Sequence, residues 1–198
     1  MAPKPSPFYT VLAVGSMPIF RGLYRLRARG VEHLPAEGGY VLAANHVSNL
    51  DPWPLGLPLW PRRFLRFMAK SELYWWPMTY VLDGGGAFPV RRGQADREAL
   101  ETAVALAREG HVIAMFPEGT RQRKGLRKKH EARPRTGAAR IALGAGVPIV
   151  PAAIKGTDRL ARLGPVRVAY GRPIPPEGTP QELTDRVMAE IERLRGTL

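Results

Sequence analysis

The sequence Asn45-His46-Val47-Ser48-Asn49-Leu50-Asp51 decides the fold of this chain. It follows an apolar run, residues 40–44, that predicts a buried strand. Pro52 comes next and suits the first turn of a helix, so Asp51 is predicted to be the cap of that helix. His46 therefore falls in a strand-to-helix turn, which is where α/β sheets hold their ligands and reacting groups.

His46 and Asp51 are close enough in sequence to interact. Asp51 comes five residues after His46, across a turn that can fold its carboxylate back to the imidazole. A histidine whose far nitrogen is held by a carboxylate is a positioned general base. The same pair is also a common polar contact within a turn, so the spacing alone does not establish catalysis.

A second polar turn follows another strand-like run. Phe116-Pro117-Glu118-Gly119-Thr120-Arg121 comes directly after the apolar residues 112–115. Parallel strands bring their carboxyl ends to one edge of a sheet. The two polar turns can therefore face each other over that edge.

Four segments, in order along the chain, resemble the signatures of the glycerolipid acyltransferases. Residues 45–51 resemble the N-H-x-x-x-x-D signature, and residues 116–121 are similar to the F-P-E-G-T-R block. Residues 86–92 resemble the middle block, a glycine-led strand that ends in arginine, and residues 150–154 resemble the V-P-x-x-I block. Four ordered blocks are far more specific than one, and the branch that they resemble most is the bacterial lysophosphatidic acid (1-acyl-glycerol-3-phosphate) acyltransferases.

The resemblance implies an activity. A fatty acyl group would pass from a thioester donor, acyl-CoA or acyl carrier protein, to the sn-2 hydroxyl of lysophosphatidic acid, giving phosphatidic acid. The attacking hydroxyl must lose its proton, and an imidazole with a reference pKa of about 6.5 can take it. We expect His46 to be this base and Asp51 to orient it. The sequence has no cysteine and no G-x-S-x-G nucleophile elbow, so direct attack without an acyl-enzyme is expected.

Other residues of the four blocks are expected to bind the acceptor or to support the site. Arginine binds phosphate bidentately, and glycine lets the backbone approach it closely. By their match to the family blocks, the acceptor- and phosphate-binding residues are Arg91, Arg92, Glu118, Gly119, Thr120 and Arg121. The supporting residues are Asn45, Pro117, Arg135 and Pro151. Glu118 is expected to orient Arg121 or to bind the glycerol hydroxyl. Arg135 stands where the family commonly has lysine, which is not an equivalent contact.

The composition limits the partners. The chain has 198 residues, of which 44% are hydrophobic, enough for the core of one domain. Its net charge of +13 favours an anionic membrane, a phosphorylated substrate or a nucleic acid. No helix-turn-helix, RNP-type or zinc pattern appears, so we expect no nucleic acid partner. No recognised ligand spacing indicates a metal, and no cofactor is expected.

The sequence leaves two alternative functions open. The chain could be a catalytically silent module of the same fold that binds the membrane surface, although the presence of both His46 and Asp51 argues against this. An active enzyme could also use another lysophospholipid or a glycolipid as its acceptor.

Residues 1–30 are predicted to form an N-terminal helical element, and residues 31–198 the acyltransferase domain. Residues 8–26 are apolar, with Arg21 and Arg25 late, and Pro18 is predicted to divide them into two short helices. The longest apolar stretch within them, residues 8–20, is shorter than the about 20 apolar residues that a membrane-spanning helix needs. We expect an anchor on the cytoplasmic face of the cell membrane, peripheral or monotopic; the alternative is a helix packed on the domain core. Its anionic contacts would be made by Arg21, Arg25, Arg27 and Arg29.

The alternation of strands and helices predicts the fold class. It favours an α/β fold with a largely parallel sheet covered by helices on both faces. The resemblance implies the glycerol-3-phosphate acyltransferase fold. Residues 71–82 are predicted to form a helix with Trp75, Trp76 and Tyr80 on one side, and these rings suit either a membrane interface or the core.

Overall fold

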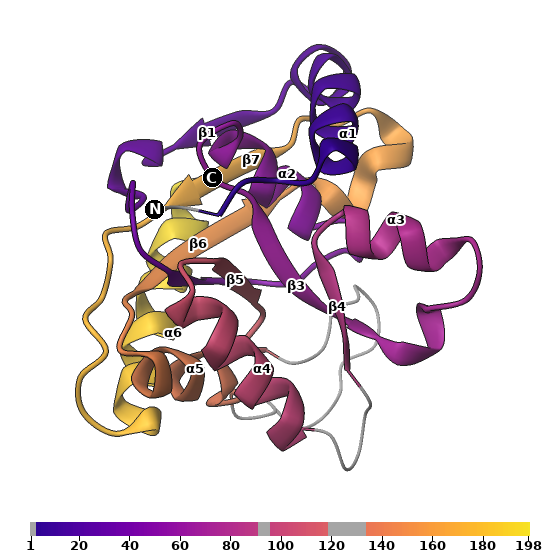
Figure 1. The fold of residues 1–198 in the computed structure, drawn as a ribbon. Helices are drawn as coiled ribbons and strands as arrows, with labels where there is room; N and C mark the ends of the chain where they lie inside the picture. The colour runs from indigo at the N-terminus through magenta and orange to yellow at the C-terminus, as the bar shows by residue number, and fades with distance from the viewer. Residues whose placement is uncertain (1–2, 91–95, 119–133) are drawn as a thin grey trace.

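A seven-stranded sheet forms the centre of the molecule (Figure 1). The computed structural model describes residues 3–90, 96–118 and 134–198. The strands lie in the order β1-β7-β6-β2-β5-β3-β4, and every neighbouring pair is parallel except β6 and β7. They are β1 (Arg27–Arg29), β2 (Tyr40–Ala44), β3 (Leu65–Lys70), β4 (Ala87–Val90), β5 (Val112–Met115), β6 (Ile149–Lys155) and β7 (Arg167–Tyr170). The predicted α/β fold with a largely parallel sheet is confirmed.

β2 is the middle strand of the sheet, and all of its residues are buried. Val41 pairs with Ile113 of β5 on one side and with Ile149 of β6 on the other. A parallel strand covered on both faces is a continuous apolar run, which is why the sequence indicated it. β2, β5 and β6 end at one edge of the sheet, called here the carboxyl edge, and the turns that follow β2 and β5 leave from it.

Helices cover both faces of the sheet (Figure 1). Side chains of β2 alternate between the two faces, Val41 and Ala43 on one and Leu42 and Ala44 on the other. The first face packs against α4 (Asp96–Arg108), α5 (Gly137–Ala145) and α6 (Pro180–Gly196). The second packs against α2 (Pro52–Gly56) and the 3₁₀ turn η3 (Leu57–Leu59), with α1 (Pro7–Pro18) beyond them.

The remaining helical elements are short, and none of the described helices has the length and apolar character needed to cross a membrane. They are the π-helical turn η1 (Ile19–Leu23), α3 (Met78–Gly84) and three 3₁₀ turns, η2 (Val31–His33), η4 (Ser71–Leu73) and η5 (Thr157–Arg162).

Two elements differ from those predicted. β1 lies within residues assigned to the N-terminal helical element and pairs with β7 through Arg27 and Arg167. Its three residues have no apolar pattern, because Arg27 and Arg29 are exposed. The helix predicted over residues 71–82 is instead η4 followed by α3, separated near Pro77, because proline has no N–H to donate and restricts the residue before it.

A buried arginine joins the loops at the sheet edge opposite the carboxyl edge. Arg63 precedes β3 and is 4% exposed. Its guanidinium donates to the backbone carbonyls of Ala36 at 3.2 Å, Gly38 at 2.5 Å and Gly110 at 2.7 Å. These carbonyls belong to the loops that lead into β2 and β5. One side chain therefore satisfies three acceptors where the strands that carry the two polar turns begin.

Replacing Arg63 tests this arrangement. Arg63→Met should lower the free energy of unfolding by about 2–4 kcal/mol, because buried carbonyls lose their donors. Urea unfolding followed by circular dichroism measures this difference. Arg62→Met changes the adjacent, exposed arginine and should cost less than about 0.5 kcal/mol. Equal losses in the two variants would contradict the assignment.

Candidate active site

The two polar turns meet at the carboxyl edge. The backbone N–H of His46 donates to Glu118 Oε2 at 3.4 Å. The imidazole of His46 stacks on the ring of Phe116, with 4.1 Å between the ring centroids and 22° between the planes. The turn after β2 and the turn after β5 therefore form one site, although 72 residues separate His46 from Glu118.

Asp51 is the most highly connected residue of the site. Its carboxylate is fully buried, and Oδ2 accepts from His46 Nδ1 at 2.8 Å and from the backbone N–H groups of Val47 at 2.7 Å and Ser48 at 2.9 Å. A carboxylate only accepts hydrogen bonds, so Nδ1 carries the imidazole proton in this contact. Nε2 is then the nitrogen with a free lone pair, which is the state a general base needs.

Asp51 occupies the N-cap position of α2, as predicted, but its side chain makes no capping hydrogen bond to that helix. The carboxylate instead turns back to the N–H groups of Val47 and Ser48 and to the imidazole. Pro52, at the first position of α2, has no N–H to offer, whereas these turn donors lie within reach.

Thr157 completes the surroundings of the carboxylate and was missed from the sequence. Its hydroxyl donates to Asp51 Oδ1 at 2.5 Å, and both residues are buried. Thr157 follows Gly156, whose φ of 97° and close approach to the Pro165 carbonyl exclude a side chain. The sequence feature that could have indicated Thr157 is its position just after a strand that ends at the carboxyl edge.

Asn45 fixes the end of β6 to the end of β2. Its side-chain amide donates to the carbonyl of Ile154 at 3.0 Å, and its Oδ1 accepts from the N–H of the same residue at 2.8 Å. The last backbone pair of these strands is Ala44 with Ala152, so the buried Asn45 continues the pairing by one step. This contact holds the strand that carries Thr157 beside the turn that carries His46.

The other supporting residues lie further from the imidazole. Pro117 is buried, and its carbonyl accepts from the backbone N–H of Arg135 at 2.7 Å, so the backbone of Arg135 borders the Glu118 turn while its side chain is exposed. Pro151 lies within β6, where its carbonyl accepts from the N–H of Gly171 at 2.8 Å. Among the predicted binding residues, Arg91, Arg92, Gly119, Thr120 and Arg121 fall outside the described part of the chain.

Glu118 has one oxygen available for a further donor. Oε2 accepts from His46, whereas Oε1 is buried without a hydrogen-bond partner among the residues that the structure describes. Burial raises the pKa of this carboxyl group, and the His46 N–H bond and the charge of Arg195 oppose that rise. A hydroxyl placed beside the imidazole is the kind of group that Oε1 could accept from.

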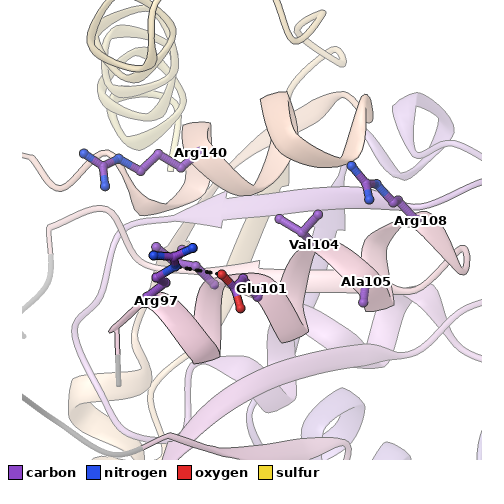
Figure 2. Close-up of a pocket in the computed structure, with 7 residues that line it drawn as sticks. Arg97, Glu101, Val104, Ala105, Arg108 and Arg140 are labelled. Carbon is purple, nitrogen blue, oxygen red and sulfur yellow. Dashed lines mark hydrogen bonds and ion pairs between the residues drawn. The ribbon is translucent and has the colours of Figure 1, made fainter. Parts of the chain in front are cut away.

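A groove of about 550 Å³ between α4 and α5 is separate from these residues (Figure 2). Arg97 pairs with Glu101 at 2.9 Å in this groove, and Arg108 donates to the carbonyl of Gly144 at 2.5 Å. None of the described residues that line it is a histidine or carries a hydroxyl group, so it does not compete with His46 as a site of acyl chemistry. The described residues also include no group of three His, Asp or Glu side chains able to hold a metal ion.

The raised pKa of Glu118 predicts a pH-dependent effect of its removal. The folded protein retains the Glu118 proton to higher pH than the unfolded chain, so this carboxyl group makes the protein less stable as pH rises from its ordinary pKa to its folded pKa. Glu118→Gln lacks this titration. Urea unfolding should therefore show that the free energy of unfolding of the variant, minus that of the wild type, increases from pH 4 to pH 7. A difference that stays constant over this range would contradict the raised pKa.

The comparisons with known proteins agree with the four sequence blocks. The profile of the Acyltransferase family matches residues 25–155. The 1-acyl-sn-glycerol-3-phosphate acyltransferase of Bacillus subtilis (strain 168) is 32% identical over 148 residues, which cover 72% of this chain and 70% of that protein. The 1-acyl-sn-glycerol-3-phosphate acyltransferase alpha of Homo sapiens is 31% identical over 178 residues, which cover 82% of this chain and 61% of the human protein.

A solved structure agrees with the fold. The crystal structure of the 1-acyl-sn-glycerophosphate (LPA) acyltransferase PlsC from Thermotoga maritima matches with a TM-score of 0.67 and 26% identity. The match covers 94% of this chain and 79% of that one. The resemblance stated from the sequence is thereby confirmed, and the chain belongs to the acyltransferase family.

Proposed function

We propose that this protein transfers a fatty acyl group from acyl-CoA or acyl carrier protein to the sn-2 hydroxyl of lysophosphatidic acid, giving phosphatidic acid. The relatives named above support the reaction class and the acceptor. The observation that carries the proposal is the 2.8 Å contact from His46 Nδ1 to Asp51, which leaves Nε2 free to accept a proton. Another lysophospholipid or a glycolipid is the alternative acceptor.

His46 acts as the base in this mechanism. Nε2 takes the proton of the acceptor hydroxyl while the hydroxyl oxygen attacks the thioester carbonyl carbon. The tetrahedral intermediate then collapses, the carbon–sulfur bond breaks, and the imidazolium returns its proton to the leaving thiolate. General-base catalysis of this kind contributes roughly 10²–10⁴-fold. Asp51 stabilises the imidazolium while its own charge is shared among the four donors bound to it.

Direct transfer without an acyl-enzyme fits the surroundings of His46. Ser48 is the hydroxyl residue of this turn, but its Oγ accepts from the N–H of Leu50 at 3.3 Å and its own N–H is bound to Asp51. A nucleophile activated by His46 would need a hydrogen bond to the imidazole. Both substrates are therefore proposed to bind together, with the acceptor hydroxyl as the only nucleophile.

Glu118 and three arginines are proposed to bind different parts of the acceptor. Oε1 of Glu118 is buried and has no hydrogen-bond partner among the described residues, which supports a hydrogen bond from a glycerol hydroxyl beside the imidazole. Arg91, Arg92 and Arg121 are proposed to bind the phosphate, on the strength of the sequence blocks alone. This division keeps the carboxylate away from the anionic group that it would repel.

Residues 1–30 are proposed to hold the protein on the cytoplasmic face of the membrane, as a peripheral or monotopic element. α1 buries Tyr9 and Ala13 against the domain and exposes Val11 and Val14, so it both packs on the core and offers an apolar side. The Oγ of Ser16 accepts from Trp53 Nε1 at 3.0 Å, which joins the end of α1 to the helix that follows Asp51. The lipid substrate would thus reach the site beside the anchor.

Acyl transfer by the purified protein tests the reaction directly. With detergent-dispersed lysophosphatidic acid and a long-chain acyl-CoA, the wild type should form phosphatidic acid. His46→Ala should lose at least about 10²-fold in turnover because it lacks the base. Circular dichroism checks that the variant is folded. Near-full activity of folded His46→Ala would refute the mechanism; a wild type inactive with acyl-CoA, with acyl carrier protein donors and with other lysolipid acceptors would refute the function.

Thr157 is proposed to position the carboxylate. Thr157→Val preserves shape but removes the donor to Asp51 Oδ1, and should lower kcat about tenfold, the equivalent of one hydrogen bond of about 1.4 kcal/mol. Thr157→Ser keeps the hydroxyl and should restore kcat to near the wild-type value. An unchanged kcat in folded Thr157→Val would contradict this role.

A further inference from the structure

Two neighbouring parts of the molecule carry most of its exposed large apolar side chains. Among the described residues, five of the thirteen lie on α1 and η1, and five lie between residues 73 and 81. The first group comprises Phe8, Val11, Val14, Ile19 and Leu23. The second comprises Leu73, Trp75, Trp76, Tyr80 and Val81, and belongs to residues 71–84, called here the aromatic segment, which includes η4 and α3.

The two groups adjoin each other. Ser6, which caps α1, donates its hydroxyl to the carbonyl of Gly84 at the end of α3, at 3.2 Å. The ring of Phe8 fills the space beside Gly84, where an added Cβ would lie 2.2 Å from the ring. Figure 1 shows α1 and α3 as neighbours on the same side of the molecule. The exposed side of α1 therefore continues onto the aromatic segment.

The aromatic rings of this segment are not part of the core. Trp76 is 78% exposed, Tyr80 68% and Trp75 56%. Single exposed apolar residues are normal on a protein surface, but a contiguous group of them marks a site of interaction. Three large aromatic rings within six residues, beside a second exposed apolar helix, form such a group.

A lipid interface is the partner that these residues fit. Tryptophan and tyrosine concentrate at the boundary between head groups and acyl chains, because their rings are apolar and carry a polar N–H or O–H. The exposed cations Lys4, before α1, Arg21, in η1, and Arg25, after η1, have no acidic residue between them in sequence. The aromatic segment itself carries Glu72 and Asp83, so its contribution is apolar rather than electrostatic.

We propose that the aromatic segment is a second membrane-contacting element, which inserts Trp75 and Trp76 into the interface beside α1. This proposal rests on the proposed function in one respect, namely that the substrate is a membrane lipid. The segment follows β3, which ends at the same edge of the sheet as the His46 turn, and leads into β4, whose end precedes Arg91 and Arg92. Because β3 and β4 are parallel, the segment begins at the carboxyl edge, which receives the acceptor, and returns to the opposite edge of the sheet.

Co-flotation of the full chain with vesicles of phosphatidylcholine and phosphatidylglycerol tests this proposal. The double variant Trp75→Ala/Trp76→Ala should partition at least about tenfold more weakly, because two large apolar side chains are lost from the interface. Val31→Ala/Leu163→Ala removes two exposed apolar side chains outside both groups and should partition like the wild type. Brominated lipids should quench the fluorescence of the wild type more than that of the double variant.

The outcomes separate this proposal from the proposed function. Equal partitioning of the wild type and the tryptophan variant, or no binding of the wild type to vesicles, would overturn the membrane contact whatever the acyltransferase activity. Concentration-dependent dimers in light scattering that only the tryptophan variant abolishes, with unchanged vesicle binding, would assign the surface to a second copy instead. Vesicle binding that depends on the tryptophans in a protein that forms no phosphatidic acid would support the contact and count against the function.

Discussion

The arrangement of the site depends on one buried carboxylate, that of Asp51. A charge removed from water is costly unless hydrogen bonds compensate for it. Oδ2 accepts three hydrogen bonds from its own turn, one of them from the His46 ring. Oδ1 accepts a hydrogen bond from the hydroxyl of Thr157, which lies 106 residues further along the chain. The requirement to satisfy this carboxylate therefore also fixes the tautomer and direction of the imidazole. The proposed general-base mechanism needs this same tautomer and direction.

The register of three parallel strands brings the residues of the site together. β2 leads to His46, β5 leads to Glu118 and β6 leads to Thr157, and all three strands end at the carboxyl edge. Asn45 bonds both backbone groups of Ile154, so β6 cannot shift relative to β2 without breaking two buried hydrogen bonds. A slip by one residue would reverse the side chains of a strand and separate Thr157 from Asp51.

The sequence indicated those features that depend on local patterns. The unbroken apolar run that forms β2 was readable in the sequence. The pairing of His46 with Asp51 was predicted from their spacing. Asp51 was also predicted as the cap of α2, and it holds that position, but its carboxylate bonds to the turn and the imidazole instead of to the helix. Thr157 lies 106 residues from Asp51, so its place after a strand indicated the carboxyl edge, but no local pattern paired it with that carboxylate.

The central claim is that Asp51 organises His46 as a general base, and Asp51→Asn tests it most directly. The amide keeps the shape and one acceptor oxygen but carries no charge to stabilise an imidazolium. Steady-state transfer to lysophosphatidic acid should fall by about 10²–10⁴-fold in the variant, with an unchanged circular dichroism spectrum. A folded Asp51→Asn protein whose kcat stays within about twofold of the wild type would contradict the claim.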